Sequence, residues 1–133
     1  MEKEAFNRGL ALRREVLGKD YIDSAMAAAD DFSLPMQQLS TEYCWGTIWS
    51  RPGLSRRDRS LLNLGMLCAL NRTHELKLHV KAALRNGLNR EEIREALLQV
   101  AIYCGIPAGI DGVRLAREAF TEFDEAEGHD DGS

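Results

Sequence analysis

The stretch that decides the fold runs from residue 71 to residue 87 and reads Asn71-Arg72-Thr73-His74-Glu75-Leu76-Lys77-Leu78-His79-Val80-Lys81-Ala82-Ala83-Leu84-Arg85-Asn86-Gly87. Its apolar side chains recur at three- and four-residue intervals, the period of a helix that buries one face. The positions on that face are Leu76, His79, Val80, Ala83 and Leu84. We expect Thr73 to cap this helix at its start and Gly87 to end it.

His79 is the polar member of the apolar face, and Glu75 lies one helical turn before it. Two interpretations are open: a hydrogen-bonded core histidine, or a titratable pair at the buried edge of the helix. A zinc-protease H-E-x-x-H motif is excluded, because His79 comes one residue too late after His74-Glu75. Residues five apart point about 140° apart around a helix, so the two histidines cannot face the same metal ion.

The composition is that of a globular chain. Hydrophobic residues make up 44% of the 133 residues, enough for one domain with a core and too many for a disordered chain. The net charge is −4, but six acids and no Lys or Arg lie between residues 122 and 131. The rest of the chain is mildly basic and has no long basic run, so nucleic acid is not an expected partner.

The three cysteines, Cys44, Cys68 and Cys104, are far apart and form no C-x-x-C motif. An odd, scattered set predicts buried free thiols in a reducing compartment, the cytoplasm, rather than a disulfide framework or a zinc ribbon. The charged start, Met1-Glu2-Lys3-Glu4, lacks the apolar core of a signal peptide. No apolar run approaches the length of a membrane span, so a membrane is not an expected partner either.

Helical periodicity recurs along the chain, and no useful run shows the two-residue alternation of a strand. Helices are expected over residues 2–17, 21–29, 32–43, 55–70, 73–86, 89–103 and 107–123. The helix over 55–70 is apolar on most of its surface and is expected to be central. Asn89 with Glu92 predicts a capping box, and Pro107 suits the first turn of the last helix. The prediction is one compact all-α domain of six or seven helices over residues 1–123, followed by an acidic, disordered tail, 124–133.

A second constellation reads Glu42-Tyr43-Cys44-Trp45-Gly46-Thr47-Ile48-Trp49-Ser50-Arg51-Pro52-Gly53-Leu54. Arg56, Arg57 and Arg59 follow it closely. Guanidinium groups bind carboxylates through paired hydrogen bonds, although a solvated helix start with tryptophan core anchors has the same pattern. We favour the solvated interpretation for Arg56 and Arg57. Arginines oppose the dipole at a helix start, so Arg51 or Arg59 is expected to have another partner.

Two further residues keep two interpretations each. Glu42 is either a base or the ion-pair partner of one of these arginines, and the ion pair is the interpretation we favour. Tyr103 either hydrogen-bonds a ligand or is a core tyrosine with a satisfied hydroxyl.

Five motifs combine into one pattern that spans roughly residues 5–120. They are Glu42-Tyr43-x-Trp45-Gly46-x-x-Trp49-x-Arg51-Pro52-Gly53-Leu54, Arg59-Ser60-Leu61, Glu75-Leu76-x-x-His79, Asn86-Gly87 and Tyr103-x-Gly105-x-Pro107. This joint pattern resembles the 4-carboxymuconolactone decarboxylase family, in the alkylhydroperoxidase D-like (AhpD-like) superfamily. The resemblance implies an all-α AhpD-like fold, a homo-oligomer (a hexamer or a trimer), and neither cofactor nor metal. Thiol peroxidases of that superfamily carry C-x-x-C where this chain has Arg72 and Glu75, so a thiol relay is excluded.

The resemblance implies a carboxy-lyase that converts 4-carboxymuconolactone to 3-oxoadipate enol-lactone with release of CO2. That reaction belongs to protocatechuate catabolism through the β-ketoadipate pathway. The alternatives are a decarboxylase or isomerase of another small lactone or keto acid, and a non-catalytic paralogue that binds a carboxylate. The run Ala108-Gly109-Ile110-Asp111-Gly112 departs from the Pro-Ala-Ala-Asn-like run of the family.

The same resemblance assigns roles to the candidate residues. His79 is expected to be the general acid, for which an ordinary imidazole pKa near ~6.5 is suitable at neutral pH. Glu75 would orient His79, and Glu42 is a reserve candidate for proton transfer. The substrate-binding candidates are Arg51 and Arg59 for the carboxylates, Trp45 and Trp49 for exclusion of water, and Tyr103.

Overall fold

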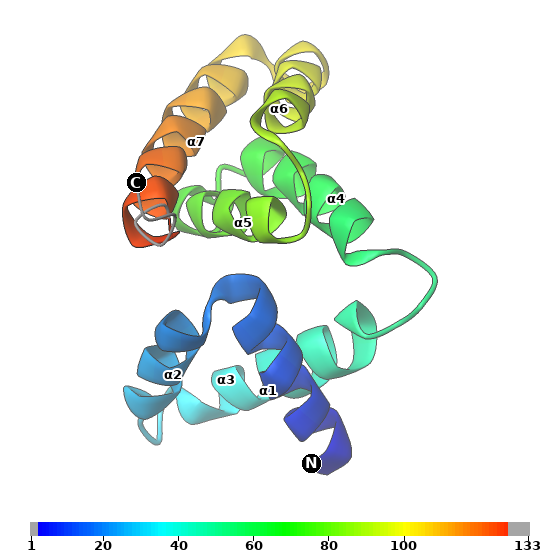
Figure 1. Ribbon diagram of the computed structural model, residues 1–133, viewed down its shortest axis with the longest axis vertical. Helices are drawn as coiled ribbons and strands as arrows, with labels where there is room; N and C mark the ends of the chain where they lie inside the picture. Colours follow the sequence, from blue (N-terminus) through cyan, green and yellow to red (C-terminus); the bar gives the residue numbers. More distant parts are fainter. Residues whose placement is uncertain (1–2, 128–133) are drawn as a thin grey trace. The chain divides into compact units, whose positions relative to one another are not determined.

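The computed structural model describes residues 3–127, and the predicted all-α class is confirmed over that range, where no strand occurs. The helices are α1 (Lys3–Leu17), α2 (Lys19–Ala27), α3 (Leu34–Leu39), the π-helical segment η1 (Ser40–Trp49), α4 (Arg56–Ala69), α5 (Thr73–Arg85), α6 (Arg90–Cys104) and α7 (Ile106–Glu127) (Figure 1). The chain divides into two compact units, Met1–Arg56 and Arg57–Ser133, and each is described here by itself.

In the first unit, α1 and η1 pack backbone against backbone at two glycines. A Cβ atom on Gly9 would lie 1.8 Å from the Thr41 carbonyl oxygen, and one on Gly46 would lie 2.1 Å from the Ala5 carbonyl oxygen. Because real side chains do not approach backbone so closely, any larger residue at either position would push the two helices apart.

The predicted helix over residues 32–43 is only partly correct. The α-helix α3 ends at Leu39, and the chain continues as a π-helix of 10 residues. Buried Arg13 of α1 stabilises the junction between α3 and η1. Its Nη1 donates hydrogen bonds to Gln37 Oε1 at 2.8 Å and to Thr41 Oγ1 at 3.2 Å. Burial lowers the pKa of the Arg13 guanidinium from its usual value.

The second unit is built around α5, the helix predicted within residues 71–87. The predicted apolar face of α5 is buried at Leu76, Val80 and Ala83, where it meets the core side chains of α6 and α7. Gly87 has φ of 101° just after α5, so it ends the helix as predicted. Thr73 does not cap it, because Thr73 is already the first helical residue and Arg72 takes the cap position.

Two other local predictions in this unit are confirmed. The capping box of α6 has both bonds, from Asn89 N to Glu92 Oε1 at 3.0 Å and from Glu92 N to Asn89 Oδ1 at 2.8 Å. Pro107 lies in the first turn of α7. The expected central position of α4 is wrong: it buries only the stripe Ser60, Leu64 and Cys68, one residue per turn.

The last helix continues beyond its predicted end at Phe123 and reaches Glu127. Its acidic residues pair with basic residues of the neighbouring helices instead of forming a solvated tail. Lys81 Nζ lies 2.5 Å from Glu122 Oε1, Arg85 Nη2 lies 3.0 Å from Glu127 Oε1, and Arg90 Nη2 lies 2.6 Å from Asp124 Oδ1. The rest of the predicted tail, residues 128–133, lies outside the described residues.

Candidate functional site

The predicted site residues divide between the two units. Glu42, Trp45, Trp49 and Arg51 belong to the first unit, and Arg59, Glu75, His79 and Tyr103 belong to the second. Each set therefore has its own geometry.

A groove of about 410 Å³ in the first unit brings two of the predicted residues together. It is lined by Arg8, Ala11, Leu12, Glu15, Trp49, Ser50, Arg51, Leu54 and Arg56. Trp49 is 7% exposed and stacks on buried Trp45 with ring centroids 4.5 Å apart. The tryptophan pair thus forms one apolar wall of the groove, with Trp49 at the surface of that wall and Trp45 behind it.

The polar side chains of the same groove are positioned by hydrogen bonds to the backbone near the end of η1. The Gly46 carbonyl oxygen accepts hydrogen bonds from Arg8 Nε at 2.8 Å and from Ser50 Oγ at 2.6 Å. A carbonyl near a helix C-terminus lacks some of its intrahelical partners, so side chains commonly bind it. Arg56 Nη1 lies 2.8 Å from Glu15 Oε2. With three guanidiniums and one carboxylate, the lining has two positive charges in excess.

The sequence did not predict Arg8 or Ser50 as part of a site, and it favoured a solvated role for Arg56. Arg8 lies 38 residues before its hydrogen-bond partner, so no local motif links the two. Glu42 lies partly buried on η1 and is not among the residues that line the groove. Its role as a base or as an ion-pair partner stays a prediction.

In the second unit, His79 lies partly buried on α5, at the edge of the apolar face. Burial lowers the pKa of His79 to about 4, and the negative charge of Glu75 opposes that shift. The expectation of an ordinary imidazole pKa is therefore wrong, because desolvation outweighs the carboxylate. At pH 7 the imidazole is neutral. Glu75 is exposed, and its Oε2 lies 3.9 Å from His74 Nε2.

The remaining candidates of this unit, Arg59 and Tyr103, differ in their exposure to solvent. Arg59 is partly buried near the start of α4. Tyr103 is 79% exposed near the end of α6, so its interpretation as a core tyrosine is wrong. A ligand-binding role for either residue stays a prediction.

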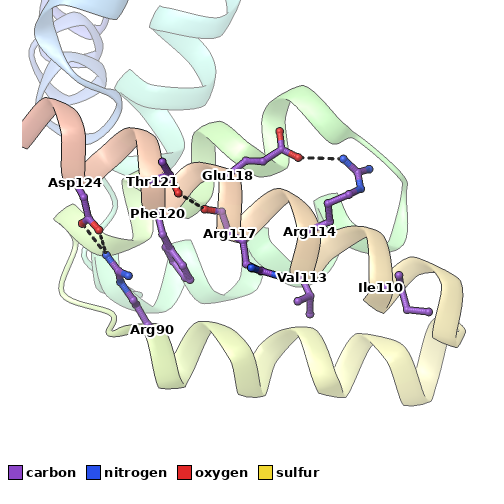
Figure 2. Close-up of a pocket in the computed structure, with 9 residues that line it drawn as sticks. All are labelled: Arg90, Ile110, Val113, Arg114, Arg117, Glu118, Phe120, Thr121 and Asp124. Atoms are coloured by element: carbon purple, nitrogen blue, oxygen red, sulfur yellow. Dashed lines mark hydrogen bonds and ion pairs between the residues drawn. The ribbon is translucent and has the colours of Figure 1, made fainter.

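A wider groove of about 660 Å³ lies on α6 and α7 and contains none of the predicted residues (Figure 2). Arg90 lies over the Phe120 ring, 4.6 Å from its centroid, and its Nη2 lies 2.6 Å from both carboxylate oxygens of Asp124. Arg114 Nη1 donates to Glu118 Oε2 at 3.1 Å. The lining of this groove has three arginines and two carboxylates, an excess of one positive charge, so the groove of the first unit, with an excess of two, is the better candidate for binding an anion.

The family model of carboxymuconolactone decarboxylases matches residues 35–118. This chain belongs to the carboxymuconolactone decarboxylase family. A nitrosuccinic acid decarboxylase of Metarhizium robertsii is 40% identical over 122 residues, which are 92% of this chain and 85% of that protein. A 4-carboxymuconolactone decarboxylase of Acinetobacter baylyi is 35% identical over 121 residues, 91% of this chain and 90% of that protein.

Membership of the carboxymuconolactone decarboxylase family makes the chain a relative of two carboxy-lyases. The matched range contains all eight predicted site residues, whereas α1, with Arg8, lies before it. Within residues 3–127, no group of three or more His, Cys, Asp or Glu side chains could hold a metal ion. The same part of the chain contains no helix long and apolar enough to cross a membrane.

Proposed function

We propose that this chain decarboxylates a small dicarboxylic acid whose own electron-accepting group takes up the electron pair. The observation that carries the proposal is the groove in which Arg51 and Trp49 meet, with two excess positive charges beside an apolar wall. Such a site suits an anion from which uncharged CO2 departs. 4-Carboxymuconolactone, converted to 3-oxoadipate enol-lactone, is the first candidate substrate. Nitrosuccinate is the second, favoured by the 40% identity to a nitrosuccinic acid decarboxylase.

Both candidate acids undergo the same bond change. The bond between carbon and carboxylate breaks, CO2 leaves, and its electron pair passes to the acceptor group. In the lactone this pair moves through the ring double bond toward the carbonyl oxygen, and in nitrosuccinate it moves onto the nitro group. A proton then adds to carbon, so the products are CO2 and an acid with one carboxylate fewer. No oxidant or reductant is consumed, and the substrate itself is the electron sink.

The side chains divide this work. Arg51 binds a substrate carboxylate by paired hydrogen bonds, and Trp49 with Trp45 excludes water from the groove. His79 supplies the proton, although only about one imidazole in a thousand is charged at pH 7 when its pKa is about 4. A carboxylate close to the ring would raise that pKa, since a nearby negative charge favours imidazolium. Glu75 assists in the same direction.

Four other predictions continue as parts of this proposal. Arg59 and Tyr103 contact the substrate, and Glu42 is a reserve proton donor. The chain acts as a homo-oligomer, which the exposed apolar side chains Ile102, Tyr103, Ile106 and Ile110 support. Its location is the cytoplasm, which the three free cysteines support.

The test is CO2 release from each acid by the purified protein, with Arg51→Gln and His79→Gln beside the wild type. We expect release from at least one acid, a raised KM in Arg51→Gln, and a kcat about 10²–10⁴ lower in His79→Gln. Arg114→Gln, in the other groove, is the matched control and should behave as wild type. No CO2 from either acid would overturn the proposal, and tight binding without turnover would favour the non-catalytic paralogue.

A further inference from the structure

Arg8 is held in the groove of the first unit by only one edge of its guanidinium group. Its Nε donates to the Gly46 carbonyl oxygen at 2.8 Å, and that oxygen also accepts from Ser50 Oγ at 2.6 Å. Gly46 itself is fixed, because a close backbone contact with Ala5 leaves no room for a side chain. The Nε bond therefore orients the planar guanidinium on a rigid part of the unit.

The other edge of Arg8, with its two Nη atoms, forms no ion pair with a carboxylate among residues 3–127. The acid of the groove, Glu15, is engaged by Arg56 at 2.8 Å. A guanidinium that is oriented by one nitrogen and presents two others has the fork geometry that binds a carboxylate. Arg8 and Arg51 both line this groove of about 410 Å³, so two guanidinium groups face one site.

We propose that Arg8 is a second carboxylate-binding residue of this groove, and that Arg8 and Arg51 together select dicarboxylates over monocarboxylates. The inference rests on the proposed function for the identity of the substrate, but not for the binding itself. Arg8 lies outside the range matched by the family model, residues 35–118, so membership of the family does not assign it. Lysine would not replace it, because one ammonium group cannot hold the Gly46 carbonyl and fork a carboxylate at once.

The test uses the intrinsic fluorescence of the stacked pair Trp45 and Trp49, of which Trp49 lines the groove. Wild type, Arg8→Gln, Arg8→Lys and the control Arg114→Gln are titrated with succinate and with propionate. We expect succinate to change the fluorescence of the wild type. Both Arg8 variants should weaken succinate binding at least about tenfold and change propionate binding much less. Arg114→Gln should match the wild type, and far-UV circular dichroism should show that all variants are folded.

The outcomes separate this inference from the proposed function. In the decarboxylation assay, Arg8→Gln should raise KM while kcat stays within about threefold of wild type. Arg8-dependent succinate binding without turnover of any acid would sustain the inference and defeat the proposed function. Turnover that is unaffected by Arg8→Gln, or succinate and propionate binding that weaken equally, would overturn the inference. Absence of succinate binding to the wild type would overturn it as well.

Discussion

The helix α5 and the π-helical segment η1 both carry candidate site residues, but they are stabilised in different ways. In α5 the apolar residues follow the helical period, and Gly87 ends the helix through its own backbone conformation. In η1 the conformation is held by another helix, through Arg13 at one end and the glycine contacts in the middle. A π-helix is rare and is frequently found at functional sites, so the tertiary contacts of η1 deserve the first experiments.

Filling the glycine contact should have the largest effect. In Gly46→Ala the new Cβ atom would lie 2.1 Å from the Ala5 carbonyl oxygen, so α1 and η1 would have to separate. We expect a loss of about 3 kcal/mol or more in the free energy of unfolding, measured in urea. Gly65→Ala in α4 is the matched control, because nothing lies within 4 Å of its Cβ position. Equal stability of the two variants would show that the backbone contact does not hold η1.

The titration of His79 tests α5 and should have the next largest effect. Its pKa is about 4 in the folded chain and near ~6.5 when unfolded, so protons bind the unfolded chain more readily. Stability should therefore be complete above pH 6.5 and decline as the pH falls toward 4, by at most about 3 kcal/mol. The free energy of unfolding, measured between pH 7 and pH 4, should lack this pH-dependent loss in His79→Gln.

A nuclear magnetic resonance titration gives the sharper measurement for the same residue. The His79 ring signals should titrate near pH 4, and Glu75→Gln should lower the midpoint further because the carboxylate raises the pKa. His74 serves as the exposed reference in the same spectra. A midpoint near the ordinary imidazole value would contradict the desolvation on α5.

Removal of Arg13 tests the junction before η1. Arg13→Met would leave Gln37 Oε1 and buried Thr41 Oγ1 without these hydrogen bonds, while it relieves the cost of a buried charge. We expect a net loss of about 2 kcal/mol. The two tryptophans, the only ones in the chain, stack at 4.5 Å within η1, so their exciton signal in circular dichroism reports its geometry. Arg14→Met, which removes a partly exposed ion pair with Asp23, should preserve that signal.

The contrast between α5, which follows its own sequence pattern, and η1, which depends on another helix, also explains what could be predicted from the sequence. The face of α5, the capping box of α6 and the groove residues Trp49 and Arg51 were predictable, because period, spacing and motif carry them. The π-helix and Arg8 were not, since both depend on contacts between residues far apart in the chain. The pKa of His79 was missed because desolvation depends on packing that a helical period does not quantify.

The sequence contains a pattern from which the extension of α7 to Glu127 could have been predicted. Lys77, Lys81 and Arg85 recur every four residues on α5, and Glu118 and Glu122 recur at the same interval on α7. Such matching intervals are typical of two helices that lie side by side with charged edges. From the sequence, Asp124, Glu125 and Glu127 are instead predicted to lie in a tail, because composition alone does not distinguish a charged helix edge from a solvated end.

The smallest predicted effect concerns this charged edge of α5. Lys81 and Lys77 both bind Glu122, and their hydrogen bonds lower the pKa of that carboxyl. A lowered folded pKa contributes stability at neutral pH that is lost as the pH falls below the ordinary range of glutamate. Because the pair is partly exposed, Lys81→Met should cost less than about 1 kcal/mol, and less still in high salt. A loss as large as that of Gly46→Ala would mean that α5, too, depends mainly on a neighbouring helix.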